Sequence, residues 1–291
     1  MTITRGIVLA GGTGSRLHPI TLGTSKQLLP VYNKPMIYYP LSVLMLAGIR
    51  DILIITTPAN QPQFKHLLGS GTQWGVRFQY TVQERPDGLA QAFILGRAFL
   101  DSGPGALVLG DNLFFGHSLP EMLARAVKRT KGATIFAHHV NDPGQYGVVT
   151  IDDNGRVVAI EEKPLHPKSH WAATGLYFYD ERICDIAAKV KPSARGELEI
   201  TAVNQAYLEM GELHVERMGR GFAWLDAGTY DGLLDASNLV QVMERRQGLS
   251  IASLEEISYR QGWIDQPMLL ELARKLGQTP YADYLKRVAN D

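Results

Sequence analysis

The chain has little cysteine, no net charge and no long apolar run. Its 291 residues include a single cysteine, which excludes an internal disulfide. The 29 basic residues balance the 29 acidic ones, so no overall charge draws the chain to nucleic acid or to an anionic membrane. Apolar stretches such as 41–47 are too short to span a bilayer, and residues 1–6 lack the layout of a signal peptide. We therefore expect a cytoplasmic protein that binds neither nucleic acid nor membrane.

Short strands rich in β-branched residues alternate with helical stretches through the first half of the chain. The expected strands are 7–9, 52–55, 78–82, 107–109 and 134–137, and the expected helices are 36–48, 62–69, 89–100 and 119–129. Helical crossovers between strands imply a mostly parallel sheet with helices on both faces. The expected fold class is therefore α/β, with a Rossmann-like three-layer α/β/α arrangement.

The second half departs from this alternation. Residues 147–179 follow a period of two, and the pair Asn154-Gly155 is a strong hairpin signal, so we expect antiparallel strands inserted in the sheet. After residue 226 the pattern is helical, over 230–246, 253–261 and 267–276, which predicts a small C-terminal helical cap. We expect one α/β domain with the insertion over residues 1–240, and a helical extension packed on it over 241–291.

Three glycines and two cations follow the first expected strand. Gly11, Gly12 and Gly14 allow the backbone to approach a ligand closely, and Arg16 and Lys26 add fixed positive charge. Backbone N–H groups and cations that converge on one turn are a common way to hold a polyphosphate. The glycines alone would equally suit an ordinary strand-to-loop turn, and the two cations favour the phosphate site.

Spacing excludes two better-known phosphate loops. A P-loop requires Gly-Lys followed by Ser or Thr, and Ser15 and Lys26 break that pattern. The dinucleotide fingerprint requires a third glycine where Leu17 stands. The pattern that remains, 11–21 followed by 25–31, resembles the signature of the sugar-1-phosphate nucleotidylyltransferases, and most closely that of the glucose-1-phosphate thymidylyltransferases.

Ligands of parallel sheets bind beyond the carboxyl ends of the strands. This rule places Arg16, Gln83 and Asp111, which follow three of the expected strands, within reach of one ligand. We expect Asp226 to lie at a second strand end, of the same kind as the strand end at Asp111. Mg²⁺ takes one or two carboxylates together with waters and phosphate oxygens. The resemblance implies that Asp111 and Asp226 are its ligands.

The resemblance also implies the nucleotide-binding residues. A glutamine amide and a backbone glycine can match the imide edge of a pyrimidine, and by resemblance Gln83 and Gly88 contact a thymine base. By resemblance, too, the nucleotide is held by Gln27 and by the glycine loop of Gly11, Gly12 and Gly14.

The expected sugar site lies in the inserted segment and beyond it. Glu162 and Lys163 supply a hydroxyl acceptor and a cation for a hexose phosphate on one short segment, although a Glu-Glu-Lys run by itself is typical of a solvated face. The resemblance implies that Gly147, Glu162 and Tyr177 position the glucose, and that Lys163 and Arg195 bind its 1-phosphate. The catalytic set implied in this way is Arg16, Lys26, Asp111, Lys163 and Arg195.

The activity that the resemblance implies is transfer of a thymidylyl group from dTTP to α-D-glucose 1-phosphate, which gives dTDP-glucose and pyrophosphate. This is a first step toward dTDP-L-rhamnose and related deoxysugars, including those of lipopolysaccharide and O-antigen. The resemblance further implies a homotetramer with feedback control at a second nucleotide site that contains Arg220 and Arg260. These arginines could instead be solvated or paired with acids such as Glu255 and Glu256.

Two other functions stay open at this stage. UTP could be the better nucleotide, because related uridylyltransferases share the fold. The chain could also be a catalytically silent subunit that binds sugar nucleotides. The presence of Arg16, Lys26, Asp111 and Asp226 favours an active enzyme.

Overall fold

A nine-stranded mixed sheet forms the centre of the protein. The structure is a computed structural model that describes residues 2–291. The main path of the sheet has the order β10-β9-β11-β6-β1-β4-β5, and β8 pairs with both β11 and β12. The parallel group comprises β1 (Arg5–Ala10), β4 (Asp51–Thr56), β5 (Arg77–Val82) and β6 (Gly105–Leu109). The other strands are β8 (Ala133–His139), β9 (Gly147–Ile151), β10 (Val157–Glu162), β11 (Trp171–Tyr179) and β12 (Leu213–Met218).

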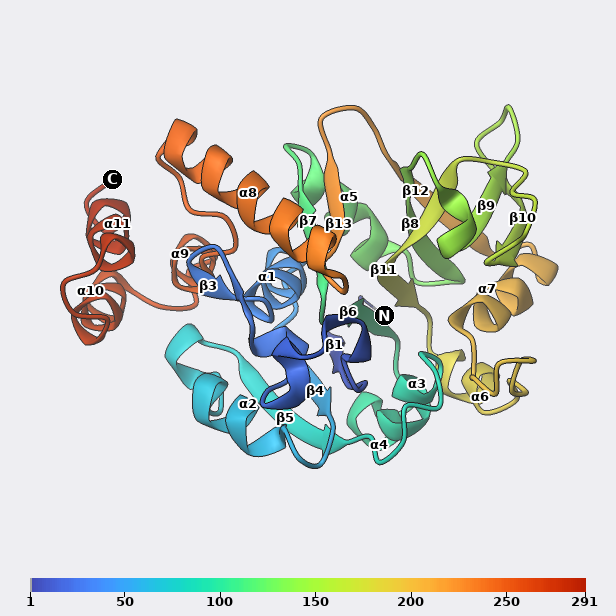
Figure 1. The fold of residues 1–291 in the computed structure, drawn as a ribbon, viewed down its shortest axis with the longest axis horizontal. Helices are drawn as coiled ribbons and strands as arrows, with labels where there is room; N and C mark the ends of the chain where they lie inside the picture. Colours follow the sequence, from blue (N-terminus) through green and yellow to red (C-terminus); the bar gives the residue numbers. More distant parts are fainter. Residues whose placement is uncertain (1) are drawn as a thin grey trace.

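Helices cover both faces of this sheet (Figure 1). They are α1 (Tyr38–Leu46), α2 (Gln61–Leu68), α3 (Gln91–Leu95), α4 (Arg97–Leu100), α5 (Leu119–Lys128), α6 (Ile183–Ala187) and α7 (Ile200–Glu209). Because side chains alternate across a strand, Val8 and Ala10 belong to the core on one face, whereas Ile7 and Leu9 belong to the core on the other. The expected three-layer α/β fold with inserted antiparallel strands is confirmed.

The local expectations differ from the structure in a few places. The expected helix over 89–100 is two short helices, α3 and α4, separated at Gly96. A Cβ at Gly96 would lie 2.7 Å from Ile7 Cδ1, so this glycine lets the segment pack tightly on β1. Helix α11 (Pro280–Val288) and strand β12 were not expected.

Four helices complete the chain. They are α8 (Tyr230–Gln247), α9 (Leu254–Arg260), α10 (Gln266–Lys275) and α11. Helices α10 and α11 lie at one end of the molecule, and α8 reaches from that side to its middle (Figure 1). Each of the four helices follows an N-cap residue whose side chain accepts a hydrogen bond from the backbone N–H three residues further on; these residues are Thr229, Ser253, Asp265 and Thr279 respectively. Residue 240, where we expect the domain boundary, lies inside α8, and the division into two units stays a prediction. None of the helices in residues 2–291 has the length and apolarity needed to cross a membrane.

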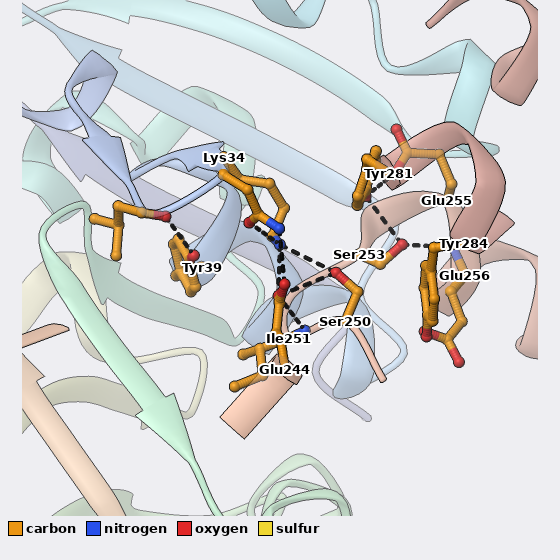
Figure 2. Close-up of polar contacts among 12 residues, drawn as sticks. Lys34, Tyr39, Glu244, Ser250, Ile251, Ser253, Glu255, Glu256, Tyr281 and Tyr284 are labelled. Carbon is orange, nitrogen blue, oxygen red and sulfur yellow. Dashed lines mark hydrogen bonds and ion pairs between the residues drawn. The ribbon is translucent and has the colours of Figure 1, made fainter. Parts of the chain in front are cut away.

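A buried polar cluster attaches these helices to the rest of the protein (Figure 2). Lys34 belongs to the hairpin of β2 (Pro30–Val31) and β3 (Lys34–Pro35), and its side chain is 2% exposed. Its Nζ donates to Glu244 Oε1 at 2.8 Å, and it lies 5.3 Å from the ring centroid of Tyr281. Tyr281 in turn donates to Glu255 Oε2 at 2.6 Å. Burial lowers the pKa of Lys34, and the carboxylate of Glu244 opposes that shift.

Candidate active site

A cavity of about 330 Å³ opens beyond the carboxyl ends of β1, β5 and β6. The structure brings fourteen of the predicted site residues to its wall: Gly11, Gly12, Arg16, Lys26, Gln27, Gln83, Gly88, Asp111, Gly147, Glu162, Lys163, Tyr177, Arg195 and Asp226. Gly14, Arg220 and Arg260 do not line it. Arg16, Gln83 and Asp111 therefore meet at one cavity, as the strand-end rule predicts.

The glycine loop follows β1 and turns sharply. Gly12 and Gly14 have φ values of +93° and +64°, which glycine adopts with little strain. Gly14 caps the short turn 15–17 and packs against Thr21, which a Cβ would meet at 3.2 Å. Gly14 therefore supports the turn of the loop and packs against Thr21, and it does not line the cavity.

Two cations and two carboxylates converge at the base of the cavity. Lys26 Nζ donates to Asp111 Oδ2, and Arg16 Nη2 lies 4.0 Å from Asp226 Oδ2. A Cβ on Gly228 would lie 2.8 Å from Arg16 Nη2, 2.9 Å from Asp226 Oδ1 and 3.2 Å from Asp111 Oδ2. Groups from three distant parts of the chain thus surround one small space that only a glycine leaves open.

The two carboxylates have opposite pKa shifts. Burial by itself would raise the pKa of Asp111, but the adjacent ammonium of Lys26 outweighs it and lowers the pKa below its usual value. Burial and the negative charge of Asp111 raise the pKa of Asp226, against the opposing charge of Arg16. The second carboxylate is therefore destabilised by the first, and a cation placed between them would relieve that repulsion.

Asp226 reaches this position by a route that the sequence does not indicate. It lies at a strand end, as expected, but that strand does not belong to the main sheet that carries β6. It ends β13 (Ala223–Asp226), which forms a separate two-stranded antiparallel sheet with β7 (Asn112–Phe115). In that pairing Asp226 lies opposite Asn112, which places its carboxylate beside Asp111.

A second charged group lines the far side of the cavity. Glu162 ends β10 opposite Gly147 of β9. Its Oε2 accepts from Thr201 Oγ1 at 2.5 Å, and its Oε1 accepts from Arg195 Nη2 at 3.1 Å. Lys163 follows with a φ of +42°. An acceptor and two cations therefore face the cavity together, as a sugar phosphate requires.

Comparison with known proteins agrees with this arrangement. Residues 5–242 match the nucleotidyl transferase family. The chain belongs to that family. Glucose-1-phosphate thymidylyltransferases are its relatives in sequence: that of Xanthomonas campestris pv. campestris (strain B100) is 57% identical over 99% of this chain and 98% of its own length. That of Neisseria meningitidis serogroup A is 56% identical over 98% of this chain and 99% of its own length.

Solved structures show the same fold. A crystal structure of a Bacillus anthracis protein in complex with sucrose is 42% identical, with a TM-score of 0.75, and the match covers 81% of this nucleotidyl transferase and 94% of that chain. A UDP-glucose pyrophosphorylase complexed with UDP-glucose is 24% identical, with a TM-score of 0.74, over 83% of this chain and 99% of that chain. At 24% identity, the similarity to the UDP-glucose pyrophosphorylase supports the fold only.

Sequence reasoning missed several residues of this nucleotidyl transferase site. One of them is Asn112, which is buried and connects three segments of the site. Its Oδ1 accepts from Gly175 N at 3.0 Å and from Trp224 Nε1 at 2.6 Å. Its Nδ2 donates to Asp111 Oδ1 at 3.3 Å. Trp224 also packs on Tyr146, with ring centroids 5.0 Å apart. The signal for Asn112 was available, since it directly follows Asp111. The signal for the aromatic pair was not, because it depends on the β7–β13 sheet.

Glu199 is a further residue that the sequence did not single out. Its Oε1 accepts from Arg195 Nη2 at 2.7 Å and from Ser193 Oγ at 2.8 Å. Burial opposes the charge on Arg195, yet its carboxylate neighbours keep the pKa of that guanidinium raised. Glu199 and Glu162 therefore hold Arg195 at the cavity wall.

The two expected regulatory arginines lie apart from this cavity. Arg260 lines a separate cavity of about 470 Å³ between the C-terminal helices and α1, and its Nε donates to Glu256 Oε1 at 2.8 Å. Arg220 is exposed in the turn between β12 and β13 and does not line that cavity. Arg260 is thus paired with Glu256, one of the two acids that we named as alternative partners of the arginines.

Proposed function

We propose that this nucleotidyl transferase moves a thymidylyl group from dTTP to α-D-glucose 1-phosphate, with pyrophosphate as the other product. The observation that carries the proposal is the convergence of Arg16, Lys26, Asp111 and Asp226 beneath the glycine loop. A glutamate-lysine-arginine group faces them across one cavity. Relatives more than 50% identical over nearly the whole chain are named for this reaction.

The reaction needs charge neutralisation and alignment. The acceptor phosphate is already an anion at neutral pH, so its attack on the α-phosphorus of dTTP requires no general base. The difficulty is that one polyanion must approach another. Arg16 and Lys26 neutralise charge that develops on the phosphorus and on the departing pyrophosphate. Lys163 and Arg195 hold the attacking phosphate in line.

Asp111 and Asp226 fit a magnesium ion that arrives with the nucleotide. Within residues 2–291 there is no cluster of three or more histidine, cysteine or acidic side chains that could hold a metal. Two carboxylates suffice for Mg²⁺, because waters and phosphate oxygens complete its coordination. The bound ion would supply positive charge at the nucleotide phosphates, and it would relieve the repulsion that raises the pKa of Asp226.

The remaining contacts follow from the cavity wall. Gln27, Gln83 and Gly88 bind the nucleotide together with Gly11 and Gly12. Gly88 has a φ of +116° and would clash with the backbone of Leu198 if it carried a Cβ. Gly147, Glu162 and Tyr177 position the glucose. Tyr177 is buried, and burial raises the pKa of its hydroxyl, so the hydroxyl stays neutral as a hydrogen-bonding group.

The decisive test is pyrophosphate release from glucose 1-phosphate with dTTP and with UTP. We expect turnover with dTTP, and the variant Arg16→Ala should lower kcat with little change in KM for dTTP, because Arg16 acts on transition-state charge. No turnover with either nucleotide, together with tight binding of sugar nucleotides, would instead establish a silent binding subunit. A higher kcat/KM with UTP would reassign the nucleotide.

We further propose that the protein self-associates as a homotetramer and is inhibited by a deoxysugar nucleotide such as dTDP-L-rhamnose. The exposed apolar side chains Leu234 and Val242 on α8 favour self-association, and the cavity beside Arg260 offers a second site. Light scattering tests the tetramer. The variant Arg220→Ala, Arg260→Ala should keep its turnover and lose the inhibition; inhibition that is unchanged and competitive with dTTP would place the inhibitor in the active site.

A further inference from the structure

Three polar side chains form a chain of hydrogen bonds behind one wall of the active-site cavity. Gln83 Nε2 donates to Gln91 Oε1 at 2.6 Å, and Gln91 Nε2 donates to Asp87 Oδ2 at 2.9 Å. Gln83 is 4% exposed and lines the cavity, whereas Gln91 and Asp87 do not line it. The side chains of Asp87 and Gln91 can therefore affect a ligand by way of Gln83.

The carboxylate sets the direction of the whole chain. An ionised aspartate accepts hydrogen bonds and donates none, so Gln91 must turn its NH₂ group toward Asp87. Its carbonyl oxygen then faces Gln83, and Gln83 must turn its own NH₂ group toward Gln91. Reversal of either amide would bring two oxygens together and remove a hydrogen bond.

The remaining atom of the Gln83 amide is therefore fixed as an acceptor. Gln83 Oε1 lies over Gly11, so close that a Cβ on Gly11 would be 2.1 Å from it. Among residues 2–291 no protein donor bonds to this oxygen. A carbonyl oxygen that has no protein donor and is held at the cavity wall is suited to a donor on the ligand.

We propose that Asp87 and Gln91 are positioning residues that make the site select a nucleobase with a ring N–H. The inference rests on the proposed function, in which Gln83 contacts the base. Thymine and uracil carry a hydrogen on N3 that Gln83 Oε1 accepts. Cytosine has a lone pair and no hydrogen at N3. In the same pose its N3 and Gln83 Oε1 are two acceptors that cannot form a hydrogen bond with each other. Since dTTP and UTP share this edge, the hydrogen-bond chain does not separate them.

The test compares kcat/KM for dTTP and dCTP, with glucose 1-phosphate as acceptor. Asp87→Asn keeps the shape and lets the side chain donate, so both glutamine amides are free to reverse. We expect the dTTP to dCTP ratio of kcat/KM to fall about tenfold or more in this variant, and also in Gln91→Met, which breaks the chain. Asp87→Glu, which keeps a carboxylate, retains the preference for dTTP.

Glu84→Gln is the matched control. It removes one negative charge from the same segment, but Glu84 is exposed and makes no hydrogen bond within residues 2–291. The ratio should stay at the parent value in this variant. Dissociation constants of dTTP and dCTP, measured by calorimetry, should show the same pattern without dependence on turnover.

Two failures are distinguishable. If the parent releases no pyrophosphate with dTTP, the proposed function is wrong. If the parent prefers dTTP, but Asp87→Asn lowers kcat/KM for both nucleotides equally and leaves the ratio of dissociation constants unchanged, Asp87 is only a structural residue and the inference is overturned. Thermal unfolding of each variant confirms that the comparison is made between folded proteins.

Discussion

Gly228 leaves no room for a methyl group, and Gly228→Ala is the sharpest test of the charge cluster. The added Cβ would lie 2.8 Å from Arg16 Nη2 and 2.9 Å from Asp226 Oδ1. Non-bonded contacts of carbon are optimal near 3.5 Å, so these groups must each move by roughly half an ångström. Gly228 does not have a positive φ, so alanine adds no backbone strain.

The displacement should affect activity far more than stability. Asp226 Oδ1 accepts from Gly228 N at 3.0 Å and cannot move away without losing that bond, whereas the end of Arg16 is flexible and would swing away from Asp226. Because misplacement of reacting groups by about 1 Å can cost about a hundredfold, we expect kcat/KM to fall about ten- to a hundredfold. The melting temperature should stay within a few degrees of the parent.

The assay is pyrophosphate release with dTTP and glucose 1-phosphate at saturating Mg²⁺. Gly219→Ala is the matched control, because no atom lies within 4 Å of its ideal Cβ and its φ is not positive. This control should keep the parent kcat/KM. Parent activity in Gly228→Ala would refute the reasoning, since the converging groups of Arg16, Asp111 and Asp226 would then tolerate a carbon atom between them.

Three further outcomes are expected. Asp111→Asn keeps the shape and removes the charge, so turnover at limiting Mg²⁺ should fall by about two to three orders of magnitude; near-parent rates would remove Asp111 from the metal site. Lys34→Met leaves the half-buried carboxylate of Glu244 with its neutral donors Asn33, Ser250 and Ile251 but without its counter-ion, so urea unfolding should show a loss of about 3 kcal/mol, and Lys34→Met, Glu244→Leu should recover most of it; equal loss in both variants would contradict the assignment. Burial raises the pKa of Tyr80 to about 12 and that of Tyr281 well above its ordinary value. The stability that depends on these two neutral hydroxyls is therefore fully present below about pH 10. It is lost as the pH rises through the pKa values of the folded state. Tyrosinate absorbance and loss of circular dichroism should therefore appear together above about pH 10, and tyrosine titration that precedes unfolding would contradict this.

Local pattern was enough to predict the frame of the site. The period of apolar residues located β1, β4, β5, β6 and β8, and the rule for parallel sheets placed the loops after three of them on one rim. The hairpin at Asn154-Gly155 and the helical C-terminus were also predicted, because turn chemistry and helix periodicity are local properties. Helix α11 was missed, although Thr279 and Pro280 carry the sequence signature of a helix start.

By itself, the sequence determined which residue types follow which strands, since that depends on neighbours in the chain. Only the tertiary structure decided how distant segments meet. Asp226 reaches Asp111 through the pairing of β7 with β13, residues more than 100 positions apart. Arg195 is held by Glu162, which lies on a distant strand, and Gly228 leaves open the space where the charges of Arg16, Asp111 and Asp226 meet. Such contacts depend on strand register and side-chain direction across the folded chain, and a one-residue change of register would turn those side chains to the opposite face.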